Sequence, residues 1–222
     1  MPRTGARAER RGSAYEPIKR SFDLTLAVIA LAIASPVLVI VAATVRLTMG
    51  SPVLWRQERS GRHGRPFDIV KFRTMRPARP GQDGSHTDQD RLTPLGRVLR
   101  ATSLDELPSL WNIVAGDMSL VGPRPLPTHY LHRYSPEQAR RLDVAPGLTG
   151  WAQINGRNDQ TWDERFDLDL WYVEHRRLRL DLAILLRTPT QVFARRGIAS
   201  PGHATMPEFT GSAGSEERAS GD

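Results

Sequence analysis

The longest uninterrupted run of hydrophobic positions lies near the N-terminus, where residues 24–45 read LTLAVIALAIASPVLVIVAATV without a single charge. About 20 consecutive apolar residues are enough to cross the hydrocarbon core of a bilayer as a helix. No polar face interrupts the run, which disfavours a buried core helix. Its length and the lack of a clear cleavage site disfavour a signal peptide. The run therefore predicts a membrane helix.

A Ser-Pro pair, Ser35-Pro36, sits at the midpoint of this run and predicts a kink, because proline removes one helical hydrogen bond and crowds the preceding turn. Both flanks are basic, with six Lys and Arg residues in 1–20 and nine in 46–79. Positive charge prefers the cytoplasmic side of a membrane. A re-entrant helix that bends at the Ser-Pro pair and returns satisfies both flanks, whereas simple spanning does not.

Shorter hydrophobic patterns come after this run. Residues 53–59 (VLWRQER) and 66–75 (PFDIVKFRTM) predict two strands joined by a glycine-rich turn. Residues 76–91 have the Pro, Gly and Asp content of a loop. Thr93-Pro94 predicts a helix start, with Leu95, Val98 and Leu99 on the buried side.

The C-terminal half predicts further helices. Ser135-Pro136-x-Gln138 has the spacing of a capping box. A helix is expected over about 162–175, where Phe166, Leu170 and Val173 recur at helical spacing. Residues 180–186 are apolar again, and Pro189 is expected to interrupt the chain beyond them. This segment could pack in the core or lie on the membrane interface, and we favour the core. The polar tails, 1–16 and 199–222, are expected to be mobile.

Composition indicates the kind of partner. The 222 residues suit one domain of ordinary size. The net charge of +7 and the pI near 10.6 favour a negatively charged partner, such as nucleic acid, anionic lipid or a phosphorylated substrate. There is no cysteine, which excludes disulfides, thiolate chemistry and Cys-ligated zinc, and the six histidines show no metal-binding spacing.

Two adjacent acids, Asp105 and Glu106, stand out in the stretch SLDEL (103–107). One interpretation is structural, because Ser103 and Glu106 have the spacing of a capping box. Asp105 would then lie in a first helical turn, where the helix dipole keeps a carboxylate ionised and attracts phosphate. Pro108 falls one turn later, so the helix either kinks there or begins later. These residues alone leave both interpretations open.

The neighbouring motifs favour chemistry. Arg100 precedes the pair by five residues, and GDMSLVGPRP (116–125) locks Arg124 between two prolines, which stiffens its backbone for a phosphate. PGLTGWAQINGRN (146–158) reads as a glycine-rich loop carrying Arg157. Two acids among stiffly held arginines suit phosphoryl transfer to or from a diphosphate.

In this order, KRSFD (19–23), the Ser-Pro run, residues 50–75, SLDEL and the two later motifs closely resemble the bacterial sugar transferases, the monotopic polyprenol-phosphate phosphoglycosyl transferases. The resemblance covers about residues 17–200. Within this family the chain looks most like the small, catalytic-domain-only members, in particular those that transfer diacetylbacillosamine 1-phosphate.

The resemblance implies a small mixed α/β membrane-associated catalytic domain with an N-terminal re-entrant helix. It divides the chain into a basic tail (1–16), the re-entrant helix (17–47), the catalytic domain (48–200) and a C-terminal tail (201–222). It also implies a location on the cytoplasmic face of the inner membrane.

The implied reaction moves a sugar 1-phosphate from a nucleoside diphosphate sugar, by resemblance a UDP-sugar, to polyprenol phosphate, with Mg²⁺ as cofactor and UMP as product. Asp105 would be the nucleophile and a Mg²⁺ ligand, with Glu106 as its partner. The remaining assignments are nucleotide or phosphate contacts for Arg100, Lys71, Pro123, Arg124, Pro125 and Arg157, and acceptor-phosphate contacts for Lys19 and Arg20.

Three rival functions remain. A non-enzymatic basic protein that binds anionic lipid or nucleic acid would leave both acids and the glycine-rich motif without a role. A Mg²⁺-dependent phosphatase or nuclease would want more carboxylates and would not need the membrane run. A hexose-1-phosphate transferase of exopolysaccharide or capsule synthesis is barely distinguishable by sequence, because the sugar is read by loop contacts. Nucleic acid is not expected as a partner, and the oligomeric state is left open.

Overall fold

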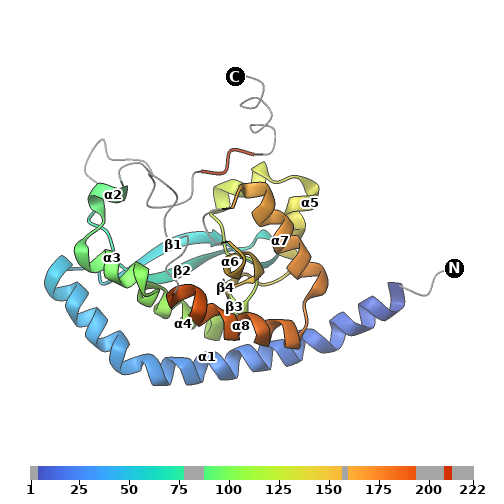
Figure 1. The fold of residues 1–222 in the computed structure, drawn as a ribbon, viewed down its shortest axis with the longest axis horizontal. Coiled ribbons are helices and arrows are strands. Elements are labelled where there is room, and N and C mark those ends of the chain that lie inside the picture. Colours follow the sequence, from blue (N-terminus) through green and yellow to red (C-terminus); the bar gives the residue numbers. More distant parts are fainter. Residues whose placement is uncertain (1–4, 78–87, 157–159, 194–207, 212–222) are drawn as a thin grey trace, which may run out of the picture.

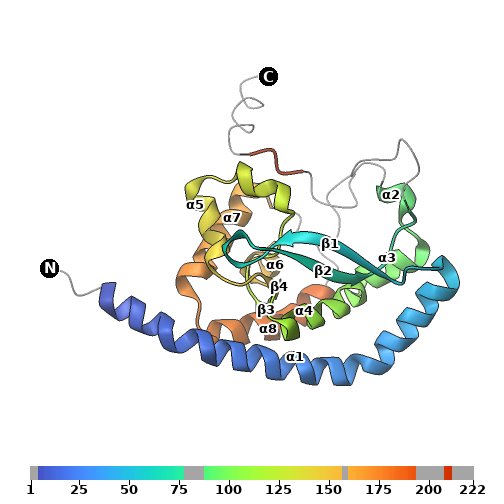
Figure 2. The ribbon, with the colours of Figure 1, turned by 180° about the vertical axis from the view of Figure 1, so that it is seen from behind.

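The protein mixes helices with short strands in the computed structural model, which describes residues 5–77, 88–156, 160–193 and 208–211 (Figure 1). The first helix, α1 (Gly5–Met49), runs along one side of a body formed by the other elements. Both figures of the whole chain show α1 as an arc, with its two ends turned toward the side on which the body lies (Figures 1 and 2).

Helix α1 keeps the apolar surface that the sequence predicts. Its part Tyr15–Met49 is long and apolar enough to cross a membrane, and only 11% of its most apolar window is buried within the protein. Exposed hydrophobic side chains include Ile33, Val39, Ile40 and Leu47. A core helix would bury such residues, so this surface is suited to lipid.

The Ser-Pro pair lies inside a continuous helix. Pro36 has no N–H to offer the carbonyl of Ala32, four residues earlier. The hydroxyl of Ser35 donates to that same carbonyl at 2.8 Å. The serine thus satisfies the acceptor that the proline leaves unpaired, which matters for backbone in lipid. The helix bearing the predicted kink is therefore continuous and curved (Figure 2).

The predicted boundary at residue 17 differs from the structure, in which α1 already begins at Gly5. Two physical reasons account for the longer helix. Residues 5–12 are rich in Ala, Arg and Glu, which have high helix propensity. Further along, Tyr15 donates to Asp181 at 2.7 Å, and Glu16 pairs with Arg62 and Arg176, so the body holds this part of the helix.

The two predicted strands form an antiparallel hairpin. Strand β1 (Leu54–Ser60) pairs with β2 (Pro66–Phe72), and the short 3-10 helix η1 (Arg62–Gly64) makes the turn. The second strand ends earlier than the predicted residue 75. Beyond Phe72 the chain turns away to pair Met75 with Leu92 in an isolated bridge.

The hairpin leads to four helical segments. These are α2 (Asp88–Arg91), α3 (Pro94–Ala101), the 3-10 helix η3 (Leu104–Ser109) and α4 (Leu110–Ala115). Helix α3 starts as predicted, with Thr93 accepting from the N–H of Gly96 and Pro94 at the first position. Only α2, at the end of the predicted loop 76–91, is described there besides Arg76 and Pro77.

The glycine-rich motif expected to be a loop instead forms strand β4 (Gly147–Thr149) and the short helix α6 (Trp151–Ile154). Strand β4 is parallel to β3 (Ser119–Val121). The glycines explain the difference, because backbone occupies the space where side chains would stand. A Cβ on Gly147 would lie 2.0 Å from the nitrogen of Gly122, and one on Gly150 would lie 2.2 Å from its oxygen.

The remaining elements are η4 (Thr128–Arg133), α5 (Pro136–Ala139), η5 (Arg140–Asp143), α7 (Trp162–His175) and α8 (Leu178–Phe193). The predicted capping box at Ser135 is confirmed, as is the helix over 162–175. The predicted interruption at Pro189 is wrong, since α8 continues past it. A proline removes a single ladder bond, and the packed turns before it hold the helix.

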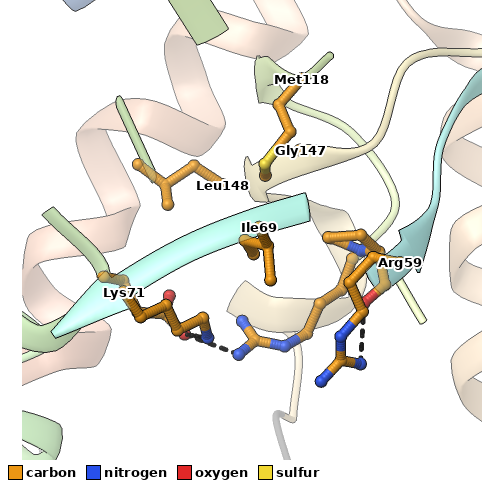
Figure 3. A pocket seen from close by; sticks show the side chains of 9 residues that line it. Arg59, Ile69, Lys71, Met118, Gly147 and Leu148 are labelled. Carbon is orange, nitrogen blue, oxygen red and sulfur yellow. Dashed lines mark hydrogen bonds and ion pairs between the residues drawn. The ribbon is translucent and has the colours of Figure 1, made fainter. Parts of the chain in front are cut away.

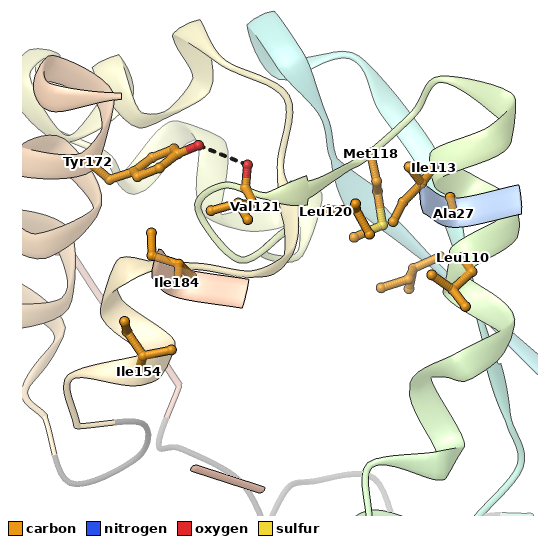
Figure 4. Close-up of a cluster of buried hydrophobic side chains, with 10 residues drawn as sticks. Ala27, Leu110, Ile113, Met118, Leu120, Val121, Ile154, Tyr172 and Ile184 are labelled. Carbon is orange, nitrogen blue, oxygen red and sulfur yellow. Dashed lines mark hydrogen bonds between the residues drawn. The ribbon is translucent and has the colours of Figure 1, made fainter. Parts of the chain in front are cut away.

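The main core lies between α1, α4, β3 and α8. Figure 4 shows Tyr172 donating to the carbonyl of Val121, and Ile184 close by. Ile184 is fully buried, whereas Leu182 and Leu186 on the same helix are exposed. Helix α8 therefore packs in the core, as favoured, and leaves an apolar side open. A second, aromatic cluster surrounds Phe209, which is 2% exposed.

Candidate active site

The acidic pair lies in η3, and its surroundings reject the capping-box interpretation. Ser103 has a left-handed backbone (φ 56°, ψ 18°) and makes no side-chain cap. A capping serine needs extended backbone geometry, so this conformation explains the failure. Helix α4 begins only at Leu110, two residues after Pro108, which settles the alternative of a later start.

Strand β2 positions η3 and the start of α4 through buried polar side chains. Asn112 accepts from the N–H of Val70 at 3.1 Å and donates to the carbonyl of Asp68 at 2.8 Å. Ser109 donates to the carbonyl of Val70 at 2.7 Å. These bonds satisfy the strand's open edge and bring Lys71, the next residue on β2, against Glu106.

Glu106 joins two cations. Its Oε1 lies 2.6 Å from the Nζ of Lys71 and 2.6 Å from an Nη of Arg124. Burial opposes its ionisation most strongly, but the charges and hydrogen bonds of Arg124 and Lys71 outweigh burial and hold the pKa of Glu106 well below its usual range. Burial in turn lowers the pKa of Lys71, against the pull of Glu106. Glu106 is thus an ionised clamp on both cations.

Asp105 has the opposite environment. It is 8% exposed, and none of the hydrogen bonds found among the described residues involves its carboxylate. Burial, and then the neighbouring charge of Glu106, raise the pKa of Asp105 from 3.8 to about 6, while Lys71, Arg100 and Arg124 act in the other direction. The two adjacent acids are therefore unequal, with one committed to internal partners and the other available to a ligand.

The cations around the pair come from four elements. Lys71 lies on β2, Arg59 on β1, Arg124 after β3 and Arg100 on α3. Arg100 donates to the hydroxyl of Thr74 at 3.1 Å. Burial, together with the charge of Arg124, lowers the pKa of Arg59 to about 10. Four cations face two carboxylates, and the positive surplus suits a diphosphate.

The Pro-Arg-Pro backbone is held at each of its three carbonyls. The N–H of Gly147 donates to Pro123 at 2.9 Å, Arg141 donates to Arg124 at 2.7 Å, and Arg59 donates to Pro125 at 3.4 Å. The stiffness predicted from the two prolines is thus reinforced by three bonds. The close packing of glycines between β3 and β4 brings Gly147 near enough to make the first of them.

A small cavity opens beside the clamp. Figure 3 shows its lining, which includes the charged side chains of Arg59 and Lys71 and also Ile69, Met118, Gly147 and Leu148. Its volume of about 20 Å³ is enough for about one water molecule. The cavity is thus too small for a phosphate group, and a larger ligand could reach these cations only from the surface.

Lys19 and Arg20 are not brought to the acidic pair. Lys19 is buried and lies 3.3 Å from Asp23 and 3.1 Å from Asp181. Arg20 donates to the carbonyls of Ile113 and Val114 at the end of α4, the latter at 3.0 Å. Both side chains thus serve internal partners, which disfavours the predicted acceptor-phosphate contact. The predicted Arg157 lies outside the described residues.

The carboxylates near Asp105 are too few to bind Mg²⁺ alone, so an ion there would need further ligands from a substrate. No group of three or more His, Cys, Asp or Glu that could hold a metal is found among the described residues. Mg²⁺ in phosphoryl-transfer sites is commonly held by one or two carboxylates plus substrate phosphates and water. Asp105, whose oxygens make no hydrogen bond among those residues, can supply such a carboxylate.

Two arginines that hold the Pro-Arg-Pro backbone were not predicted from the sequence. Arg141 is 2% exposed, pairs with Asp169 at 2.7 Å and donates a hydrogen bond to the carbonyl of Arg124. Arg59 supports Pro125. Neither has a local signal, because each resembles any other arginine in an arginine-rich chain until the distant partner is known.

An apolar helix beside a body that holds a buried acid pair among four cations suits a membrane-associated protein that acts on a phosphorylated compound. The chain belongs to the bacterial sugar transferase family, whose model matches residues 14–195, and it is an enzyme of that family. The family predicted from the sequence is thereby confirmed.

Several relatives support this assignment. The chain is 49% identical to the uncharacterized sugar transferase EpsL of Bacillus subtilis, covering 88% of this chain and 96% of the relative. It is 42% identical to a UDP-glucose:undecaprenyl-phosphate glucose-1-phosphate transferase of Caulobacter vibrioides (77% and 67%). It is 39% identical to the undecaprenyl-phosphate galactose phosphotransferase of Salmonella typhimurium (81% of this chain, 41% of that longer protein). The resemblance to diacetylbacillosamine transferases stays a prediction.

Proposed function

We propose that the protein transfers a hexose 1-phosphate from a nucleoside diphosphate hexose, UDP-glucose or UDP-galactose, to polyprenol phosphate. The products are a polyprenyl diphosphate hexose and UMP, as in the first membrane step of exopolysaccharide assembly. The names of the Caulobacter and Salmonella relatives, a glucose-1-phosphate transferase and a galactose phosphotransferase, support this sugar class over diacetylbacillosamine. The single observation that carries the reaction type is the unequal acid pair, in which Glu106 is clamped and Asp105 is not.

In the first step a carboxylate oxygen of Asp105 attacks the β-phosphorus of the sugar nucleotide. A bond forms between that oxygen and the phosphorus, while the bond to the bridging oxygen breaks and its electron pair leaves with UMP. A pKa of about 6 leaves most of the Asp105 carboxylate ionised at neutral pH. Because its oxygens have no hydrogen-bond partner among the described residues, their lone pairs are available for attack.

In the second step an oxygen of polyprenol phosphate attacks the same phosphorus, and the Asp105 carboxylate leaves unchanged. Splitting the reaction in two avoids bringing the acceptor phosphate and the sugar nucleotide together as polyanions. Lys71 and Arg124, fixed by Glu106, offer their remaining N–H groups to phosphate oxygens. Asp105, together with the substrate phosphates, would hold Mg²⁺, which would supply further neutralisation of phosphate charge.

The membrane arrangement fits these substrates. A soluble sugar nucleotide and a lipid phosphate meet only at headgroup depth. The arc of α1, whose ends turn toward the catalytic body, supports a re-entrant helix with both flanks and the body on the cytoplasmic face (Figure 1). The basic charge of both flanks supports the same orientation.

The test is a release assay. Purified protein, undecaprenyl phosphate and Mg²⁺ are incubated with a panel of UDP-sugars that includes UDP-glucose, UDP-galactose and UDP-diacetylbacillosamine. We expect UMP release that continues over many turnovers only with lipid and is fastest with one of the two hexoses. Fastest release with the bacillosamine nucleotide would overturn the sugar assignment, and release with none would overturn the reaction.

A further inference from the structure

A second and larger cavity lies where α1 ends. It measures about 460 Å³, within the range of small-ligand sites, and opens between the last turn of α1 and the start of α3. Figures 1 and 2 show these two helix ends close together, and the hydroxyl of Thr93 contacts the sulfur of Met49 at 3.6 Å. Its lining consists of Thr48, Met49, Arg73, Arg76, Pro77, Thr93, Pro94 and Leu95.

The charge in this cavity has one sign. Arg73 and Arg76 line it, and none of the described lining residues is acidic. Arg73 is 8% exposed, and its guanidinium donates to the carbonyls of Ser51 at 3.0 Å and Gly50 at 2.8 Å. Its Nε has no partner among the described residues. The start of α3 adds the positive end of a helix dipole, and the negative end of α1 at the same cavity is neutralised by Arg73 through the carbonyls of Gly50 and Ser51. The site therefore favours an anion.

The rest of the cavity is apolar, and its position suits a lipid. Met49, Leu95 and the two prolines form its non-polar lining. Beside it along the helices, Leu47 is 86% exposed and Val98 is 57% exposed. Because α1 is the candidate membrane helix, its end marks headgroup depth. A phosphate carried on a hydrocarbon chain matches both halves of this lining.

A short path joins the cavity to the acidic pair. Thr74 follows Arg73 directly, and its hydroxyl holds Arg100 at 3.1 Å. Arg100 in turn belongs to the charges that act on Asp105. Arg73 in the cavity lining is thus linked to Arg100 through its neighbour Thr74 and the hydrogen bond between Thr74 and Arg100. No such path leads from Lys19 among the described contacts, and its charge is neutralised internally.

We propose that this cavity, lined by Arg73 and Arg76 at the end of α1, receives the phosphate and first isoprene units of the lipid acceptor before transfer. The inference rests on the proposed function, because that function supplies the acceptor. It assigns the acceptor to a place other than Lys19 and Arg20.

The experiment uses the full chain in lipid nanodiscs and changes an exposed lining residue. Arg76→Gln and Arg76→Glu are compared with Arg97→Gln and Arg97→Glu, since Arg97 is an exposed arginine on α3 outside the cavity lining. We expect Arg76→Gln to raise the KM for undecaprenyl phosphate about tenfold, as for one lost charge-assisted contact, and Arg76→Glu to raise it further. The Arg97 variants should stay within about twofold, and UMP released without lipid should be unchanged in all four.

Two results would overturn the proposal. One is equal KM values for the Arg76 and Arg97 variants. The other is a selective loss of binding to phosphatidylglycerol vesicles with an unchanged acceptor KM, which would assign the cavity to bulk phospholipid. Failure of the proposed function is separately visible, because wild type would then release no UMP from any UDP-sugar. Equilibrium binding of undecaprenyl phosphate to the same variants would still decide the cavity's role.

Discussion

Replacing Asp105 by asparagine should stabilise the protein while abolishing transfer. Burial and the charge of Glu106 raise the pKa of Asp105 from 3.8 to about 6 in the folded state. Its ionised form is therefore disfavoured by folding, and asparagine keeps the shape without the charge. Each pKa unit corresponds to about 1.4 kcal/mol, so the expected gain in the free energy of unfolding is about 3 kcal/mol at pH 7.5.

The gain should depend on pH in a defined way. Below about pH 4 the carboxyl is neutral in both the folded and the unfolded state, so wild type and Asp105→Asn should be equally stable. The wild type loses stability as pH rises from about 4 to 6, because the unfolded chain ionises first. Above about pH 6 the difference should be constant.

Thermal unfolding in detergent across pH 4–8 measures this. A gain of about 3 kcal/mol corresponds to roughly 6–12 °C in Tm for a chain of this size. Asp68→Asn, which removes an exposed carboxylate on β2, is the matched control and should move Tm by little at any pH. Equal melting temperatures for wild type and Asp105→Asn at pH 7.5 would refute the reasoning. A difference in Tm that stays the same from pH 4 to pH 8 would refute it as well.

Three further predictions concern single contacts. Arg124→Ala should slow UMP release about 10²–10³-fold with a small change in Tm, because its side chain is 35% exposed; an early-melting variant of full specific activity would mark it as structural. Asp181→Asn should lower the free energy of unfolding by about 3 kcal/mol in a denaturation assay, since it leaves Lys19 buried with a single acid; an unchanged stability would contradict that role. Pro36→Leu should let a fraction of molecules span the membrane, and a cysteine placed at the N-terminus would then react with a periplasmic reagent in that variant; labelling of the parent to the same extent would contradict a re-entrant helix.

Local patterns predicted the elements well. The apolar run, the hairpin and the caps at Thr93 and Ser135 depend on residues within a few positions of one another. Hydrophobic period and capping chemistry act over that range, so the sequence alone carries them. The acid pair was also visible, because its two charges are adjacent and stand among conspicuous Arg and Pro motifs.

Long-range partners were not predictable. The sequence marks Lys19 as a cation near the membrane, but Asp181, its partner, is 162 positions away. In the same way, Ser103 has the right spacing for a capping box, and only the packing of η3 on β2 gives it a left-handed backbone. The motif 146–158 reads as a loop because glycine suggests flexibility, whereas here glycines admit a neighbouring backbone. In each case tertiary packing decides the outcome.

The most direct test of the account is to trap the phosphosugar on the protein. Wild type and Asp105→Asn are incubated with Mg²⁺ and UDP-hexose labelled in the sugar, without lipid, quenched in denaturant and digested. We predict label on the wild-type peptide that contains Asp105, a burst of UMP no larger than the enzyme present, and loss of the label when undecaprenyl phosphate is added before the quench. Wild type that turns over freely but retains no label, or Asp105→Asn that keeps its activity, would contradict the assignment of Asp105 as nucleophile.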